Sequence, residues 1–350
     1  MRPATDANLH RTPGQELLHM SCHLPHQRSR TRSAVPTMFL VASVISPISW
    51  ASHSASSSLG GGQFAAPIDT ESAVPLQRGG WTIGVRSEFV DIETIPADRA
   101  LALHEADEGA DLHRVKSLWS TSLGLAYGAT ENLTVGFRLP YHLRNDVSEP
   151  EDGEIEVLGD SSGFGDLTAF GQYRFIHDAS ADRHGTLLFG IKTPTGRTQE
   201  RNANGNRFEA EQQPGSGSWD PFLGLAFSQS VGSTTYAASA VYTLVGEGTQ
   251  DTDLGDLFAY STAIAYRLDG STSVDLVLEL NGQWREKQTV DDERERNSGA
   301  HQLYLSPGIR IGSASNVSLS LSFGLPLVEN FNGDQDELDY RIQGTLSYRF

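Results

Sequence analysis

The sequence is nearly without cysteine, because Cys22 is the only one among its 350 residues. We expect Cys22 to be lost with a cleaved amino-terminal segment, so the mature protein would have no disulfide, thiolate metal site or cysteine nucleophile. Long apolar runs are also missing, and hydrophobic residues make up only 38% of the chain. Since a transmembrane helix needs about 20 apolar residues, this composition excludes a bundle of membrane-spanning helices.

Positive charge is scarce as well. Lys and Arg number 26 against 44 Asp and Glu, which gives a formal net charge of -18. Such an acidic chain repels the phosphate backbone of nucleic acids. We therefore expect no nucleic-acid partner, and the sequence indicates neither a cofactor nor a bound metal.

The amino terminus begins with a long polar stretch that leads into an apolar run over residues 38–51. Basic residues precede the run, and small residues end it at Ser49 and Ala51. This order is typical of a secretory signal peptide, which we place at residues 1–51 with an unusually long polar n-region. Residues 52–79 are rich in Ser, Gly and Pro and are predicted to form a linker.

From residue 80 to residue 350 the sequence alternates between apolar and polar positions. The last thirteen residues show this most clearly: the apolar set is Leu338, Tyr340, Ile342, Leu346, Tyr348 and Phe350, and the polar set is Asp339, Arg341, Gln343, Thr345, Ser347 and Arg349. A period of two predicts a strand. About twelve such segments follow one another, and aromatic residues gather near their ends. We expect the apolar face to contact lipid and the charged face to line a lumen.

The connections between these segments alternate between short and long polar ones. The short connections lie at residues 130–132, 177–184, 231–233, 269–271 and 313–314, and the long ones at 93–114, 145–162, 195–215, 247–254, 288–299 and 329–337. A soluble β-sandwich, the competing interpretation, has no reason to keep this rhythm. The sequence therefore predicts an all-β fold over residues 80–350: an antiparallel up-and-down transmembrane β-barrel of about 12 strands, with short periplasmic turns and long acidic extracellular loops.

Charged residues occupy the polar face of many predicted strands. The lumen-facing candidates are Arg86, Glu88, Arg138, Asp166, Arg174, Lys192, Arg267, Asp275, Glu279, Arg310 and Arg341. They are expected either to form a charged constriction that selects solutes by sign or to pair across strands and fill the lumen. The sequence leaves both alternatives open, because strand register is not visible in it.

Four sequence blocks between residues 162 and 220 are more specific than the alternation of apolar and polar residues that any barrel shows. They read GFGDL from Gly163, QYRF from Gln172, GIKTPTG from Gly190 and PGSGSWD from Pro214. This order resembles the outer-membrane barrels of the family described as "Putative MetA-pathway of phenol degradation". The resemblance implies a channel or transporter that passes small, aromatic or hydrophobic compounds through the bacterial outer membrane. It brings no catalytic residues with it.

Two other functions compete with transport. A hydrolase with its catalytic residues at the rim is the less favoured alternative. Outer-membrane phospholipases place a Ser two residues after the catalytic His, whereas His142 is followed at that distance by Arg144, so we expect no enzyme and no catalytic residue. Alternatively, the loops could give the barrel a structural or adhesive role at the cell surface. The acidic stretch over residues 145–162 offers oxygen ligands for divalent cations, but such a charge run is more often a solvated loop.

The last residue of the chain is an aromatic one. Phe350, with Tyr348 on the same face, resembles the carboxy-terminal signal by which outer-membrane barrels are recognised for insertion. We therefore expect the barrel assembly machinery, outer-membrane lipid and lipopolysaccharide as partners, besides a small-molecule solute.

Overall fold

The computed structural model describes residues 67–106, 112–270, 273–312 and 316–350. The signal peptide predicted over residues 1–51 and the first part of the predicted linker, residues 52–66, lie outside these ranges. No helix in the described ranges is long and apolar enough to cross a membrane.

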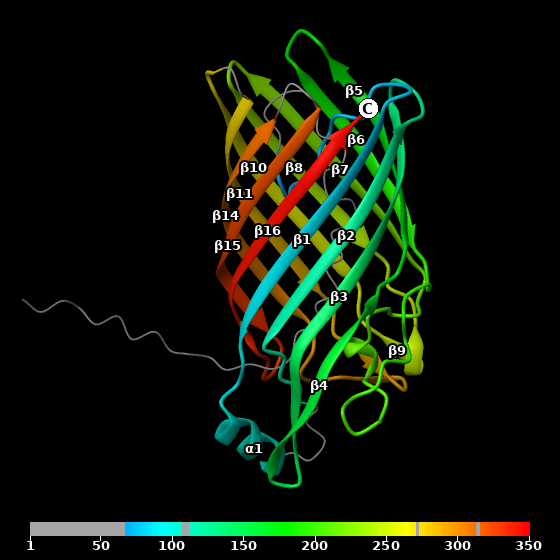
Figure 1. The fold of residues 1–350 in the computed structure, drawn as a ribbon, viewed down its shortest axis with the longest axis vertical. Helices are drawn as coiled ribbons and strands as arrows, with labels where there is room; N and C mark the ends of the chain where they lie inside the picture. Colours follow the sequence, from blue (N-terminus) through cyan, green and yellow to red (C-terminus); the bar gives the residue numbers. More distant parts are fainter. Residues whose placement is uncertain (1–66, 107–111, 271–272, 313–315) are drawn as a thin grey trace, which may run out of the picture. The chain divides into compact units, whose positions relative to one another are not determined.

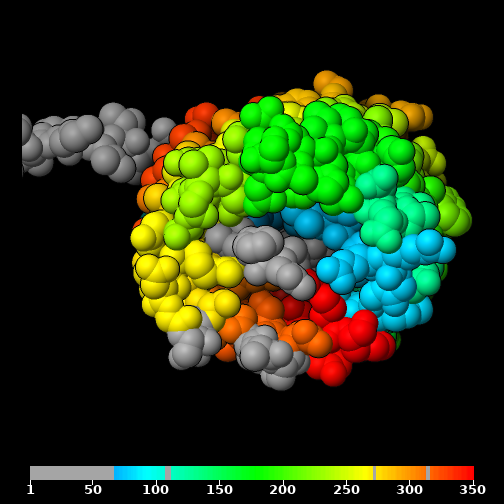
Figure 2. Space-filling view, turned by 90° about the horizontal axis from the view of Figure 1, so that it is seen from above, coloured from blue at the N-terminus to red at the C-terminus, as the bar shows by residue number. Residues whose placement is uncertain are grey.

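Twelve long strands form the wall of the barrel (Figure 1). They are β1 (Trp81–Glu93), β2 (Ser117–Gly128), β3 (Leu133–Glu151), β5 (Thr168–Asp178), β6 (Arg183–Lys192), β7 (Asp220–Val231), β8 (Thr234–Thr243), β10 (Leu257–Leu268), β11 (Ser273–Arg285), β14 (Ala300–Gly312), β15 (Val317–Phe331) and β16 (Glu337–Arg349). Each strand is antiparallel to its neighbours in sequence, and β1 also pairs with β16. The sheet is therefore closed, as the end view shows (Figure 2), and the predicted fold class is confirmed.

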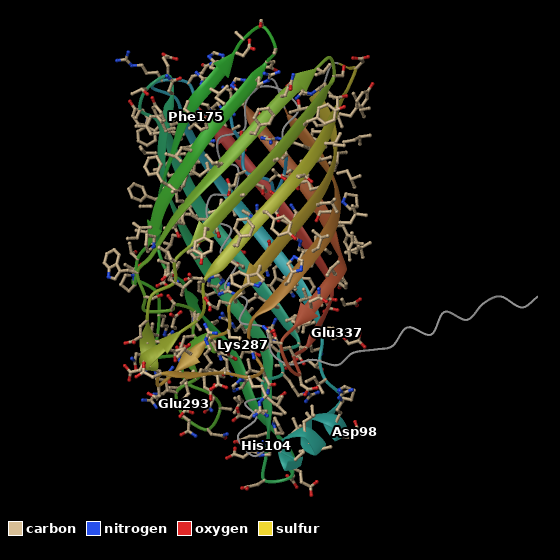
Figure 3. The ribbon with its side chains drawn as sticks, turned by 180° about the vertical axis from the view of Figure 1, so that it is seen from behind. Asp98, His104, Phe175, Lys287, Glu293 and Glu337 are labelled. Carbon is tan, nitrogen blue, oxygen red and sulfur yellow. The ribbon has the colours of Figure 1, made fainter. Side chains whose placement is uncertain are left out.

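The wall exposes its apolar residues and buries its charged ones. On β1, Ile83 and Val85 are 40% and 43% exposed, whereas Arg86 and Glu88 are each 8% exposed. The other wall strands also carry exposed large apolar residues, and Phe175 projects near the end of the barrel that bears the short turns (Figure 3). An apolar outer surface of this extent contacts lipid, and a polar interior faces a lumen.

The long connections contain more structure than the sequence predicted. Strand β3 continues through the expected loop at residues 145–162 and pairs with β4 (Glu154–Phe164) in a hairpin. The turn consists of Asp152 and Gly153, which both have positive φ (47° and 79°), as a two-residue hairpin turn of this kind requires. The prediction of a loop there was wrong, because the apolar alternation fades beyond the membrane while the backbone pairing continues.

Helical turns and a small sheet occupy other long connections, at the end of the barrel opposite the short turns. Helix α1 (Ala97–Ala106) follows Pro96, and Asp98 in its first turn suits the positive end of the helix dipole. The shorter elements are η1 (Ala210–Gln212), η2 (Thr249–Asp251), β9 (Thr252–Asp253), β12 (Thr289–Val290) and β13 (Glu293–Arg294). Figure 3 shows Asp98, His104, Lys287 and Glu293 gathered at this end, opposite Phe175.

A β-bulge changes which face Leu338 occupies. Asp91 pairs with Tyr340 but Ile92 pairs with Leu338, so Asp339 is the extra residue on β16. Leu338 is 4% exposed and packs inside the barrel, although we expected it on the lipid face. Because the side-chain period is two, one extra residue moves every preceding side chain to the other face. Asp339, expected in the lumen, is instead exposed at the bulge.

Candidate functional site: the charged lumen

Most of the charged residues predicted to face the lumen are buried on the inner side of the wall. The buried ones are Arg86, Glu88, Arg138, Asp166, Lys192, Asp275 and Glu279. Arg267, Arg310 and Arg341 are half-buried, with Arg267 paired to Asp275 across strands β10 and β11. Arg174 lies at the rim, where it donates hydrogen bonds to the Glu131 carbonyl and to Asn132 Oδ1 in the β2–β3 turn.

Residues 67–79, here called the lumen strap, lie inside the barrel, although we predicted them as the end of a linker. Their first anchor is the Glu279 carboxylate on β11, which accepts hydrogen bonds from three successive amides. The Ile68, Asp69 and Thr70 nitrogens are 3.0, 2.9 and 3.1 Å from its oxygens. Three N–H donors on one carboxylate satisfy a charge that would be costly to bury alone.

Asp69 is the second anchor of the lumen strap. Its Oδ1 is 2.6 Å from Arg86 Nη2, and its Oδ2 is 2.8 Å from Arg341 Nη2. Arg341 also donates to Asn281 Oδ1, and its guanidinium lies 4.5 Å from the centre of the Tyr304 ring. Each charge of this network has a partner, which offsets the cost of taking it out of water.

The rest of the lumen strap contacts strands on the other side of the barrel. The Ser72 carbonyl accepts a hydrogen bond from Gln172 on β5, and the Ala73 carbonyl accepts one from Thr186 Oγ1 on β6 at 2.6 Å. The Leu76 amide donates to Thr134 Oγ1 on β3 at 2.8 Å. The lumen strap therefore runs across the lumen between opposite parts of the wall.

Three apolar side chains of the lumen strap are also buried against the wall. Ile68 packs with Ala265 and Val277, and Ala73 and Leu76 pack into two further clusters. Their exposures are 2%, 0% and 3%. The contacts combine polar anchoring with apolar burial, and together they hold the lumen strap against the inner side of the wall.

A second filled region lies at the end of the barrel that carries the long loops. The loop-end apolar cluster consists of Val90, Ile92, Val115, Leu118, Val147, Leu158, Phe208, Tyr304 and Leu338. Phe208 comes from the connection between β6 and β7 and is 1% exposed. Of the two alternatives that the sequence left open, the described residues favour a lumen filled by paired charges and by chain segments.

Three of the four sequence blocks between residues 162 and 220, all except the one from Gln172, converge on one buried cluster. Asp166 Oδ1 accepts a hydrogen bond from the Gly196 amide, and Oδ2 accepts from both the amide and the hydroxyl of Ser216, each at 2.8 Å. Lys192 Nζ donates to Ser216 Oγ at 2.6 Å and forms ion pairs with Asp166 and Asp220. The motifs thus tie the junction between β4 and β5 to the loop that precedes β7.

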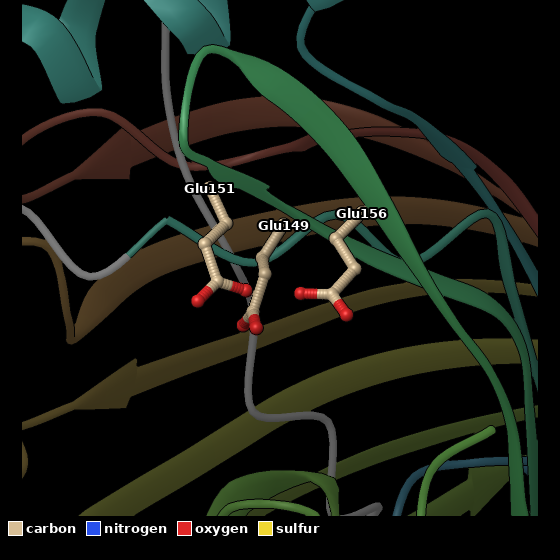
Figure 4. A group of neighbouring side chains, drawn as sticks. All are labelled: Glu149, Glu151 and Glu156. Carbon is tan, nitrogen blue, oxygen red and sulfur yellow. The ribbon is translucent and has the colours of Figure 1, made fainter. Parts of the chain in front are cut away.

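The acidic hairpin carries a group of exposed or half-buried carboxylates. One oxygen each from Glu149, Glu151 and Glu156 lies within 4.8 Å of the other two (Figure 4). The hydrogen bond with Glu156, followed by its charge, raises the pKa of Glu151. Asn204 donates to Glu156, and His113 Nε2 is 3.1 Å from Glu149, so two of the three carboxylates already have partners from the chain, and we assign no metal to the group.

Sequence reasoning missed several lumen residues. His142 and Arg144 share the face of Arg138 on β3, so the period of two would have been enough to find them. Asp220 ends the last motif block, where it could be read only as a turn residue. Asp69 belongs to a segment without strand periodicity, and no local signal marks it.

The comparisons with known proteins agree with this fold. The family described as "Putative MetA-pathway of phenol degradation" matches residues 109–329, which is more than half of the chain. An outer membrane channel from Pseudomonas putida F1 is 16% identical, with a TM-score of 0.57, and the match covers 83% of this chain and 99% of that one. The β domain of the Bordetella autotransporter BrkA is 13% identical, with a TM-score of 0.45 over 78% of this chain and 100% of that one. No curated protein matches the chain.

Proposed function

Because this chain belongs to the family described as "Putative MetA-pathway of phenol degradation", we propose that it is a channel for small solutes, including aromatic or hydrophobic ones. The closed twelve-stranded wall with its lipid-facing apolar surface is that of a bacterial outer-membrane protein. Its interior is lined by charged and polar side chains in place of a continuous apolar core. A polar interior supports passage of solutes rather than a purely structural barrel.

One observation carries the proposal: the lumen strap, a chain segment that is not part of the sheet, crosses the lumen and bonds to strands on opposite sides of the wall. The lumen strap is held by side chains of the wall, above all Glu279, Arg86 and Arg341. Such contacts can be exchanged for water one at a time, whereas the paired strands of the wall cannot separate without breaking the sheet. We therefore infer that solutes pass when the lumen strap shifts.

Uptake into liposomes tests the channel directly. Proteoliposomes that contain the purified protein should swell in isotonic solutions of small solutes such as phenol, catechol and glycerol faster than protein-free liposomes do. A variant that lacks residues 67–77 should show faster swelling than the wild type. Swelling no faster than in protein-free liposomes for every solute, in both proteins, would contradict the proposal.

A role of the loops at the cell surface is a second candidate. It is favoured by the β3–β4 hairpin and helix α1, which extend beyond the wall at the end with the long loops (Figure 1). Shortening the hairpin by residues 148–157 should leave solute swelling unchanged if the lumen is the functional part. Loss of a surface phenotype, such as adhesion, with unchanged swelling would support the second role.

The remaining assignments are part of the same proposal. We propose cleavage of residues 1–51 as a signal peptide, recognition of Phe350 and Tyr348 by the barrel assembly machinery, and contact of the outer loops with lipopolysaccharide. We propose no catalytic role. An assay for phospholipid and peptide hydrolysis by the purified protein tests that expectation, and any turnover above a protein-free control would contradict it.

A further inference from the structure

Two histidines lie opposite each other beside the short turn that joins β5 to β6. His177 on β5 and His184 on β6 are direct partners in the ladder. Their ring centres are 5.2 Å apart, with an angle of 18° between the ring planes. Imidazole is the commonest protein ligand of metal ions, so two imidazoles this close on neighbouring strands can supply two ligands to one ion.

A β-bulge on β5 brings the two histidines together. The register of the ladder shifts between Arg174 and Ile176, so Phe175 is the extra residue. Because side chains alternate along a strand, the extra residue moves His177 onto the inner face of the wall, opposite His184. Bulges often re-aim a side chain at a functional position.

His184 is oriented by a carboxylate on one of its two ring nitrogens. Its Nε2 is 3.1 Å from Asp182 Oδ1, which places the proton on Nε2 and leaves the lone pair on Nδ1. The residue is 8% exposed, and Nδ1 is buried without a hydrogen-bond partner among the described residues. Histidines that bind metal ions are commonly held in this way by a carboxylate on the other nitrogen.

His177 supplies the second imidazole from an exposed position. An exposed side chain changes rotamer within nanoseconds, so its ring can turn toward Nδ1 of His184 while the strands stay in place. For a tetrahedral ion with bonds of about 2.0–2.1 Å to nitrogen, two imidazole ring centres lie roughly 5 Å apart. The observed separation of 5.2 Å agrees with that value.

The charges around the pair are balanced. Asp178 ends β5 and Asp182 lies in the turn. Arg183 is opposite Asp178 in the ladder, and Arg174 donates its hydrogen bonds to the β2–β3 turn. The two carboxylates offset the two guanidinium groups, so a cation can approach the histidines.

We propose that His177 and His184 bind a divalent transition-metal ion at the periplasmic mouth of the barrel, with Asp182 as the residue that positions His184. Imidazole suits Zn²⁺, Cu²⁺ and Ni²⁺, whereas Mg²⁺ and Ca²⁺ prefer oxygen ligands. With two protein ligands, the ion keeps water at its other positions. The site goes beyond the proposed channel and does not depend on it.

A bound ion would join β5 and β6 next to their turn. A ligand that binds only the folded protein stabilises it by mass action. We therefore expect Zn²⁺ to slow amide hydrogen exchange over residues 179–182 and to leave exchange in the turn at residues 231–233 unchanged.

Isothermal titration of the purified protein in detergent, without an affinity tag, tests the site. Zn²⁺ and Cu²⁺ are the probes, and Mg²⁺ is the control ion. We expect both probes to bind the wild type, Cu²⁺ more tightly than Zn²⁺, and Mg²⁺ to bind far more weakly. His177→Gln, His184→Gln and Asp182→Asn should each weaken binding at least about tenfold, since even the loss of a group that orients a ligand costs about 10–100-fold.

Three further variants separate this pair from other groups. His104→Gln changes a histidine on α1 at the opposite end of the barrel (Figure 3), and Asp269→Asn removes an exposed carboxylate from another short turn. Both should bind as the wild type does. The double variant of His177→Gln with His184→Gln should bind no more weakly than the weaker single variant, because residues that share one ion have non-additive effects.

Each variant is compared only after it shows the heat-dependent gel shift of a folded barrel. The site is wrong if neither Zn²⁺ nor Cu²⁺ binds the wild type more tightly than the double variant, or if Mg²⁺ binds as tightly. It is also wrong if the effects of the two single histidine substitutions add, or if His104→Gln weakens binding as much as His184→Gln. Swelling of proteoliposomes is measured without metal, so these outcomes do not affect the test of the channel.

Discussion

The lumen strap is tied to the seam at which the barrel closes: Asp69 Oδ2 lies 2.8 Å from Nη2 of Arg341 on β16. Its other oxygen lies 2.6 Å from Nη2 of Arg86 on β1. Strands β1 and β16 are the first and the last of the wall and pair with each other. One carboxylate from the lumen strap therefore neutralises an arginine on each side of the closing pair, which couples docking of the lumen strap to closure of the barrel.

Replacing Asp69 should release the lumen strap. Asp69→Asn keeps the size of the side chain but removes the carboxylate that Arg86 and Arg341 share, and breaking a buried ion pair in this way costs about 3–5 kcal/mol. We expect faster proteolysis within residues 67–79 and a lower unfolding temperature. Asp98→Asn changes an exposed residue on α1 and should leave both unchanged; equal behaviour of the two variants would contradict the anchoring role.

The motif cluster should be needed for order in the loop before β7. Asp166→Asn removes the negative charge that faces Lys192. It also leaves one acceptor oxygen in place of the two that accept three hydrogen bonds from Gly196 and Ser216. We expect faster amide hydrogen exchange over residues 195–219, while the periplasmic turns exchange as before. Unchanged exchange in this loop would show that the cluster does not hold it.

Low pH should also destabilise the loop over residues 195–219, through protonation of Glu211. Burial raises the pKa of the Glu211 carboxyl, but the hydrogen bond and the charge of His113 outweigh burial and hold that pKa below its ordinary value of 4.5. A lowered pKa in the folded protein means that ionised Glu211 stabilises the loop above about pH 4.5, and that this stability is lost as the pH falls through the folded value.

Hydrogen exchange measured below pH 4.5, corrected for intrinsic rates, should therefore show loss of protection around residues 208–213. Glu211→Gln should abolish this pH dependence, because the titrating group is gone. Glu105→Gln on α1 serves as a control and should keep the pH dependence of the wild type. The same pH dependence in Glu211→Gln would assign the effect to another group.

The carboxy terminus should be needed for assembly. The amide and carbonyl of Phe350 pair with Trp81 at 3.0 and 2.8 Å, and its ring stacks on Tyr348. Deletion of Phe350 should reduce the amount of folded barrel in the outer membrane while total synthesis stays constant, as shown by heat-modifiable mobility on gels. Normal insertion without Phe350 would contradict its role.

The wall could be predicted from sequence because its signal is local. Exposed residues such as Val85 and buried ones such as Arg86 alternate with a period of two, and this is the pattern that lipid on one side and a lumen on the other impose. The same reasoning failed at Leu338, because the extra residue at Asp339 shifts the phase. It also failed at Asp152 and Gly153, where the turn signal was hidden within an acidic run.

The lumen could be predicted only in part. Alternation on β3 placed Arg138 inside and would have placed Arg144 there too, but it does not reveal which charges meet. Asp69 lies 272 residues from Arg341 in sequence, and the lumen strap carries no strand periodicity. Its position depends on contacts with many strands at once, which no single stretch of sequence encodes.

The central claim is that the lumen strap closes the path through the barrel. A reducible disulfide between the lumen strap and the wall tests it most directly. Thr186 Oγ1 on β6 donates to the Ala73 carbonyl, and Cys22 is the only cysteine of the chain, so Ala73→Cys with Thr186→Cys in a Cys22→Ser background adds a single candidate disulfide. Conductance of this variant in planar bilayers should be low when oxidised and should rise on reduction, with no change in the single-cysteine controls. Equal conductance in both states, with the disulfide verified by mass spectrometry, would contradict the claim.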